Sequence, residues 1–172
     1  MSSTATNYTI LLLGGTGKIS SRIAPLLSKA NYTTIQASRS GNAASCPNCS
    51  GVKFDWFDET TYRILFSDSK ISAIFIVAPP LLEGLPLVQK FVEIARESGV
   101  TRFVLLSASI IDVGDGPAMS RVSGYIEGLG LEYAILRPTW FMGMFLYSFF
   151  VSHSAVLAGT PRHKPLKRLY LA

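Results

Sequence analysis

The sequence has little of several residue types, and each scarcity narrows the class of protein. Of its 172 residues two are cysteines, two are histidines and 16% are charged. Low charge together with 48% hydrophobic residues excludes a disordered chain and a coiled coil. The length allows one domain rather than two, with enough apolar residues to fill its core.

The two cysteines, Cys46 and Cys49, are too few for a zinc site, because such a site takes four ligands and both histidines lie far along the chain. The pair stands in a loop rich in Gly, Asn, Ser and Pro, whereas a thioredoxin-type pair opens a helix after a strand. We therefore expect no metal and two free loop thiols in a reducing cytosol. The first apolar run, Ile10–Leu13, is too short for a signal peptide and lacks a basic flank, so we expect a cytoplasmic protein.

Excess negative charge is also lacking, since the net charge is +5. Four positive residues, Arg162, Lys164, Lys167 and Arg168, fall at the very end of the chain, and without them the balance is 12 positive against 11 negative. The body is near neutral and has no basic stripe interleaved with aromatics. We therefore expect no nucleic-acid partner.

Apolar runs rich in β-formers alternate with segments of helical period, which is typical of βαβ units and a parallel sheet. The strands are expected at Thr9–Leu13, Thr33–Ser38, Val52–Phe54, Ala73–Val77, Arg102–Leu106 and Glu132–Leu136, and the helices at about Ile19–Ala30, Glu59–Phe66, Leu85–Ser98 and Ala118–Gly128. Six strands with right-handed crossovers predict an α/β fold, a doubly wound parallel sheet of Rossmann-like, NAD(P)-binding type in the order 3-2-1-4-5-6. Its ligand crevice should lie outside the carboxyl ends of the strands.

The first strand runs directly into Gly14–Ser21 and then a helix, which is the context of a dinucleotide-binding loop. Gly14 can make the tight turn, and Gly17 leaves no side chain between the backbone and a pyrophosphate. The helix that begins near Ile19 would point its N–H groups at that anion. Ser20 occupies the third glycine position, where a small residue still permits close helix–strand packing.

A Walker loop is the rival interpretation of the same stretch. It fails because its first glycine would fall at Leu12, and because Ile19, not Ser or Thr, follows Lys18. A glycine turn that binds nothing is the remaining alternative.

The second strand ends at Ser38–Arg39, where an NAD-binding fold usually has Asp or Glu for the ribose 2′-hydroxyl. A guanidinium there can hold a 2′-phosphate, so Arg39 predicts NADP(H); a merely solvated arginine is the alternative. By position, Phe54–Trp56, which includes Asp55, would contact the adenine. Ala78 and Pro79, followed by Pro80, would line the ribose side.

Four separated segments carry a family pattern: Gly14–Lys18, Ser38–Arg39, Val77–Pro80 and Leu136–Met142. Together they resemble the NmrA-like atypical short-chain reductases. Phe54–Thr60, Leu106–Ile111 and Gly116–Met119 are similar to one branch, the fungal festuclavine/agroclavine dehydrogenases of ergot alkaloid biosynthesis. The resemblance covers roughly residues 8 to 142.

The resemblance implies NADPH-dependent reduction of a cyclic iminium, formed from chanoclavine-I aldehyde, to a tetracyclic clavine alkaloid. It makes Gly14, Gly15, Gly17, Lys18 and Arg39 cofactor contacts. With the rest of the loop and the positional assignments, the expected cofactor contacts are Gly14, Gly15, Thr16, Gly17, Lys18, Ile19, Ser20, Arg39, Asp55, Ala78 and Pro79. Ser107 would face the nicotinamide and substrate, unless its hydroxyl only caps a loop. A non-catalytic NADP(H)-sensing regulatory module and an inactive truncated reductase stay open as alternatives.

The chain departs from the family after Met142. We expect an NADP-binding domain at 1–142 and a short atypical tail at 143–172, with the substrate subdomain largely missing. The uncharged stretch Trp140–Gly159 has the length of a membrane span, but basic residues after it argue against insertion.

The usual proton donor of carbonyl-reducing short-chain enzymes is a tyrosine with a lysine four residues on, and none of the seven tyrosines has it. The helix that should carry the pair has Tyr125 and Leu129. An iminium needs no proton when hydride adds to it, so Tyr125 is expected to pack or to shape the pocket.

Overall fold

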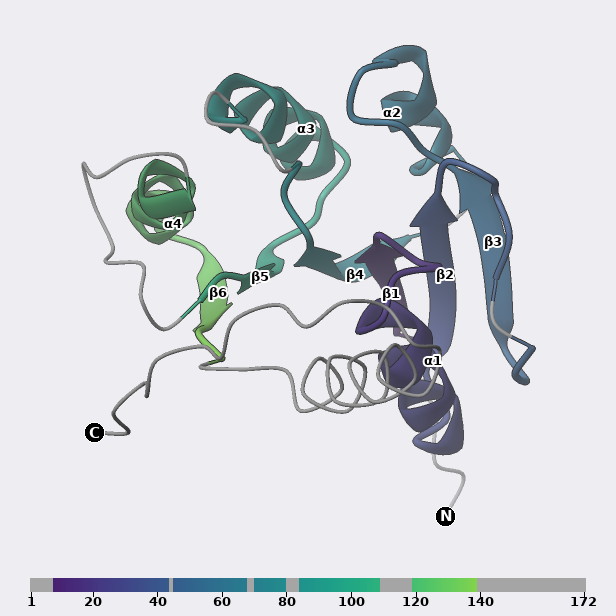
Figure 1. Cartoon of the computed structure of the whole chain (residues 1–172). Coiled ribbons are helices and arrows are strands. Elements are labelled where there is room, and N and C mark those ends of the chain that lie inside the picture. The colour runs from purple at the N-terminus through teal and green to yellow at the C-terminus, as the bar shows by residue number, and fades with distance from the viewer. Residues whose placement is uncertain (1–7, 44, 68–69, 80–83, 109–118, 139–172) are drawn as a thin grey trace, which may run out of the picture. The chain divides into compact units, whose positions relative to one another are not determined.

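The computed structural model describes residues 8–43, 45–67, 70–79, 84–108 and 119–138 (Figure 1). All of the helices and strands described lie in the first of two compact units, residues 1–137. The predicted domain boundary at 142, the tail at 143–172 and the candidate span Trp140–Gly159 lie outside the described residues. So do Pro80, Ile111 and Gly116.

The described unit is a parallel six-stranded sheet with helices between the strands. The sheet order is β3-β2-β1-β4-β5-β6, so the predicted doubly wound, Rossmann-like sheet is confirmed. The elements are β1 (Thr9–Leu13), α1 (Ser20–Lys29), β2 (Thr33–Ser38), β3 (Cys49–Lys53), α2 (Thr60–Ile64), β4 (Ile71–Ile76), α3 (Leu85–Glu97), β5 (Arg102–Leu106), α4 (Met119–Gly128) and β6 (Glu132–Leu136).

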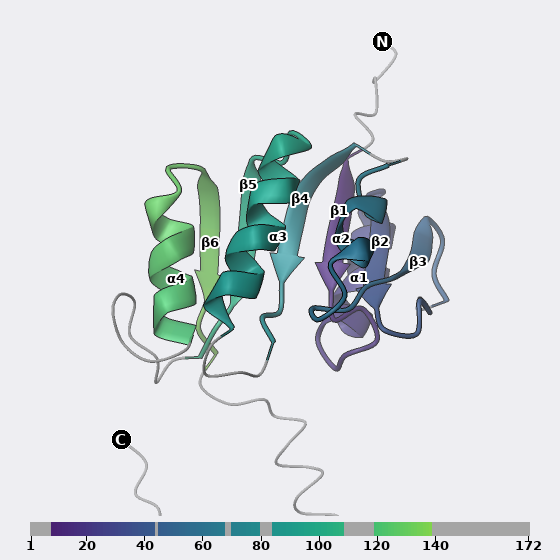
Figure 2. The same cartoon turned by 90° about the horizontal axis from the view of Figure 1, so that it is seen from above.

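The helices form two layers, one on each face of the sheet (Figures 1 and 2). Helices α2, α3 and α4 cover one face, and α1 lies on the other. In α3, apolar residues at helical spacing form one buried stripe that includes Val88, Phe91 and Ala95, as the sequence pattern predicts. This stripe joins the larger of the two apolar clusters, which fills the space between the sheet and α2–α4.

Strand β5 shows how the two faces differ. Phe103 and Leu105 are fully buried in the larger cluster, whereas the alternate residues Val104 and Leu106 are half-buried on the face of α1. This alternation follows from the period of two of a β-strand. Among the described residues, no helix is long and apolar enough to cross a membrane.

Two expectations about the cysteine segment are corrected. Strand β3 begins at Cys49 rather than Val52, because Cys49–Lys53 pairs in parallel with β2. Cys46 and Cys49 form a disulfide, so the prediction of two free thiols is wrong. The physical reason is a tight turn: Asn48 has a φ of +57° and Cys49 N–H donates to the Cys46 carbonyl, which brings the two Cα atoms to 5.5 Å.

Candidate functional site

A cleft of about 420 Å³ opens at the carboxyl edge of the sheet, where the crevice was expected. Its walls come from the loops that follow β1, β2, β3 and β4. The lining residues are Gly14, Thr16, Gly17, Ala37, Ser38, Arg39, Phe54, Asp55, Trp56, Phe57, Val77, Ala78 and Pro79. Seven of the eleven cofactor residues predicted from the sequence therefore line one cleft.

The glycine loop makes one wall of this cleft with its backbone. Gly14 has a φ of +63°, which side chains disfavour, and its carbonyl accepts a hydrogen bond of 2.7 Å from Gly17 N–H. A Cβ on Gly17 would lie 2.9 Å from that carbonyl oxygen. The loop is thus a tight turn with bare backbone exposed to the cleft, which is the surface that a pyrophosphate requires.

The other four predicted loop residues do not line the cleft. Gly15 faces β2, where its N–H donates to Ala37 O at 2.8 Å and an added Cβ would lie 2.7 Å from Gln36 Cβ. Ser20 is buried and its hydroxyl donates to Leu13 O at 2.8 Å, which is the close helix–strand packing expected at that position. Ile19 packs against the smaller apolar cluster, and Lys18 is exposed. Gly15, Ile19 and Ser20 thus hold the loop against β1, β2 and α1.

Arg39 is exposed and lines the cleft as the first residue after β2. Below it, the Ser38 hydroxyl is buried beside the Ser40 hydroxyl, at 3.3 Å. Asp55 also lines the cleft, and its carboxylate accepts the Phe57 N–H at 3.0 Å. The cleft thus holds one guanidinium beside the exposed glycine backbone.

The sequence interpretation missed Phe57 and Val77 as lining residues. Phe57 is 69% exposed although it is a large apolar side chain, and Val77 follows directly after β4. A signal for Phe57 existed, since three aromatic residues occur in the four positions that follow Lys53 at the end of β3. Nothing local pointed to Val77, because the sequence assigned it to the strand itself.

Ser107 follows β5 and is nine-tenths buried, and it does not line the described cleft. Its N–H donates to Leu136 O at 2.8 Å. Its hydroxyl has no hydrogen-bond partner within the described part of the chain, so it caps no described group there. The segment 109–118, which comes next, lies outside the described residues.

Tyr125 belongs to α4 and packs against the larger apolar cluster, not into the cleft. Burial raises the pKa of its hydroxyl, and the negative charge of Glu93 on α3 raises it further. A tyrosine placed between two helices in this way shapes the core. Within the described part of the chain, no three His, Cys, Asp or Glu side chains come together as metal ligands.

The sheet order, the glycine turn and the cleft at the carboxyl edge define a Rossmann-like α/β protein. Solved structures have the same fold. A nucleoside-diphosphate-sugar epimerase from Staphylococcus aureus matches 86% of this chain and 56% of its own, with a TM-score of 0.64 and 19% identity. A Rossmann-fold NAD(P)-binding family protein from Shigella flexneri matches 77% of this chain and 68% of its own, with a TM-score of 0.61 and 21% identity.

Sequence comparison identifies a narrower group within this class of fold. The chain is a homologue of the fungal agroclavine and festuclavine dehydrogenases, which confirms the predicted resemblance. It is 41% identical over 142 residues to agroclavine dehydrogenase of Claviceps fusiformis, with 80% of this chain and 48% of the relative covered. It is 43% identical over 141 residues to festuclavine synthase I of Penicillium roqueforti, with 78% and 48% covered. The chain thus spans about half the length of these relatives, and no family model matches it.

Proposed function

We propose that this chain binds NADP(H) in the cleft and is the cofactor-binding part of a cytoplasmic oxidoreductase of clavine alkaloid metabolism. One observation carries the proposal: Arg39 and the bare backbone of the glycine loop line the same cleft. The names of the relatives support the alkaloid as substrate class. The partner in this proposal is a small alkaloid, not a nucleic acid or a membrane.

Each group in the cleft has a definite role in this proposal. The backbone of Gly14–Gly17 would hold the pyrophosphate, supported by Gly15 and Ser20 behind it. Arg39 would pair with the 2′-phosphate, because a guanidinium presents two parallel donors to such an anion. Asp55, Trp56, Ala78 and Pro79 would enclose the adenosine between the loops after β3 and β4.

The chemistry proposed is hydride addition to a cyclic iminium. NADPH supplies the hydride when bound, the iminium carbon accepts it, and the positive nitrogen becomes a neutral amine without a proton transfer. The protein then needs to position the reactants and exclude water. The position of Tyr125 supports this, since the residue where a proton donor would stand packs against the larger apolar cluster and does not line the cleft. Ser107 would position the substrate at the end of β5.

Calorimetry with NADPH and NADH tests the cofactor assignment. Wild type should bind NADPH more tightly than NADH, because a hydrogen bond to a charged group is worth about 1.5 to 3 kcal/mol, or about 10- to 150-fold in affinity. Arg39→Ala should remove this preference. Arg63→Ala removes the same charge from an exposed position on α2 and should keep it. Equal affinities of the wild type for the two cofactors would refute the assignment.

Turnover tests the reductase part separately. The full chain is mixed with NADPH and a cyclic iminium, and consumption of NADPH is followed by its absorbance. Consumption supports the reductase, and efficient reduction of simple ketones would overturn the iminium chemistry. Tight NADPH binding without consumption would instead indicate a sensing module or an inactive short form.

A further inference from the structure

Trp56 connects two loops that the sheet order keeps apart. It follows β3, whereas Val77 follows β4, and strands β2 and β1 lie between these two in the sheet. The Trp56 indole Nε1–H nevertheless donates a hydrogen bond of 3.2 Å to the Val77 carbonyl. The loop after β3 therefore crosses the carboxyl ends of two strands and is tied to the far wall of the cleft.

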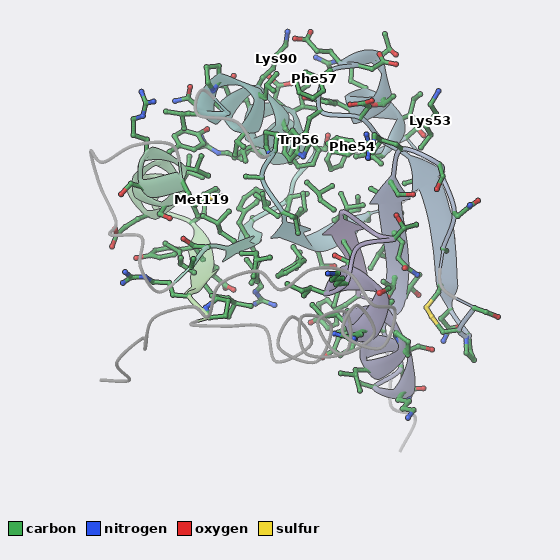
Figure 3. All side chains as sticks on the ribbon, viewed as in Figure 1. Lys53, Phe54, Trp56, Phe57, Lys90 and Met119 are labelled. Atoms are coloured by element: carbon green, nitrogen blue, oxygen red, sulfur yellow. A yellow bond between two sulfur atoms is a disulfide. The ribbon has the colours of Figure 1, made fainter. Side chains whose placement is uncertain are left out.

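The indole is fixed from behind by an aromatic cluster. Its ring packs edge-on against Phe54, Tyr62 and Phe91, with centroids 5.0, 6.2 and 5.4 Å away. The Tyr62 hydroxyl donates a 2.7 Å hydrogen bond to the Trp56 carbonyl, so the backbone is held as well. Figure 3 shows Trp56 beside Phe54 in the layer between the sheet and the helices above it.

The connection continues from Val77 to the glycine loop. The Val77 side chain stands 3.5 Å from the position that a Cβ on Gly14 would occupy, so it packs directly on that turn. Trp56, Val77 and Gly14 all line the cleft. One chain of contacts thus joins three of its walls, from the α2–α3 core to the phosphate-binding turn.

We propose that Trp56 is a positioning residue. By donating its indole N–H to the Val77 carbonyl, it sets the width of the adenosine end of the cleft. The proposal rests on the proposed function, because it needs a dinucleotide in that cleft. If the hydrogen bond is absent, the loop after β3 loses its tie to the far wall. It is then held by its aromatic packing against Tyr62 and Phe91 and by the Tyr62 hydrogen bond. The adenosine half of the ligand then binds a site that is less completely formed beforehand, and affinity falls.

The test compares wild type with Trp56→Phe, which keeps an aromatic ring and removes the N–H donor. The probes are NADPH and 2′,5′-ADP, which contains only the adenosine half. Both should bind about two- to tenfold more weakly to Trp56→Phe, the change that corresponds to the net worth of one hydrogen bond. The loss should be equal for the two probes, because both contain the adenosine half, to which this proposal assigns the wall with Trp56.

Phe66→Leu is the matched control. Phe66 belongs to the same aromatic cluster through Phe91, with centroids 6.0 Å apart, and does not line the cleft. Urea unfolding should show that this variant loses stability, while its affinity for both probes stays at the wild-type value. A general loosening of the core would instead weaken binding in both variants, and that result would overturn the positioning role.

The remaining outcomes separate this proposal from the proposed function. If wild type binds both probes and Trp56→Phe binds them equally well, the bridge has no role and the function stands. If wild type binds neither NADPH nor 2′,5′-ADP, both proposals fall.

NMR of the nitrogen-labelled indole groups tests the hydrogen bond directly. The indole N–H signal of Trp56 is the one that disappears in Trp56→Phe. In free wild type this N–H should exchange slowly with solvent, and fast exchange would contradict the hydrogen bond.

Discussion

The two faces of the sheet are built differently. The face under α2, α3 and α4 holds the larger apolar cluster, in which Phe91, Phe103 and Leu105 are completely buried. On the other face, among the described elements, α1 alone packs, and the smaller cluster has three buried members, Leu12, Ala24 and Phe75. A cavity of about 500 Å³ lined mainly by apolar side chains lies on that second face.

The two faces support different walls of the cleft. Trp56 belongs to the walls of the cleft and at the same time packs against Phe91 of the densely packed face. The glycine loop, by contrast, is backed by Ser20 at the start of α1. We infer that the wall formed by the loop after β3 depends on the large cluster and that the wall formed by the glycine loop depends on the contact of α1 with β1.

The largest expected effect comes from two neighbouring leucines of β5. Leu105→Ala should destabilise the fold by about 2 to 5 kcal/mol, because it opens a cavity in the larger cluster. Leu106→Ala removes the same atoms from a half-buried site on the face of α1 and should cost about 1 to 2 kcal/mol. Urea unfolding of both variants checks this, and equal losses would show that the two faces are equally well packed.

A smaller loss of stability is expected where the glycine loop meets the sheet. Gly15→Ala places a Cβ 2.8 Å from the Gln36 backbone carbon, so the loop or β2 must shift, at about 1 to 3 kcal/mol. Gly128→Ala on α4 meets nothing within 4 Å and should leave stability unchanged or slightly raised, since alanine favours a helix. Thermal unfolding compares the two variants, and equal melting temperatures would contradict the close contact of Gly15 with β2.

The disulfide should contribute less to the unfolding free energy, because the loop that it closes is very short. Reduction of Cys46–Cys49 is expected to lower the unfolding free energy by less than about 2 kcal/mol. Urea unfolding with and without dithiothreitol measures this, and Cys46→Ser with Cys49→Ser is the control that should not respond. Mass spectrometry after thiol alkylation of the native protein would contradict the disulfide if both cysteines were labelled.

The last expected effect, the smallest when counted for one pH unit, is a pH dependence of the large cluster. Burial, with the negative charges of Glu59 and Asp55, raises the pKa of Tyr62 from 10.0 to about 12. Between pH 10 and 12 the unfolded chain releases a proton that the folded chain keeps, so stability should fall by about 1 kcal/mol per pH unit. The contribution is fully present below pH 10 and is lost as pH rises through 12. Tyr62→Phe should lack this slope, and an identical slope in both proteins would contradict the shift.

Much of the fold was predictable, because it is encoded by local patterns. Strands β1, β2, β5 and β6 have the predicted ends, and the helix starts differ by at most one residue. Strand β3 was placed too late because Ser50 and Gly51 have the composition of a loop. Gly51 is needed there because a Cβ would lie only 2.1 Å from the Gly41 carbonyl oxygen, a contact invisible in the sequence.

The candidate site was predictable only in part, for a similar reason. The glycine turn and Arg39 each follow one strand, so their position at the cleft edge follows from the sheet order. Phe57 and Val77 escaped notice because their place depends on the path of two loops across the sheet. Ser107 was expected to face the substrate; it is buried directly after β5 and is not among the residues that line the cleft.

The sequence by itself determined the kind and order of the elements, since apolar periodicity and glycine turns act over a few residues. It also determined that a guanidinium follows β2 at the edge where ligands bind in such sheets. Only the tertiary structure decided which residues meet across strands, such as Trp56 with Val77 and Gly15 with Gln36. The physical reason is that residues which meet across strands are far apart in the chain. Gly15 meets Gln36 only after β1 and β2 have paired, and Trp56 meets Val77 only after β3, β2, β1 and β4 have paired.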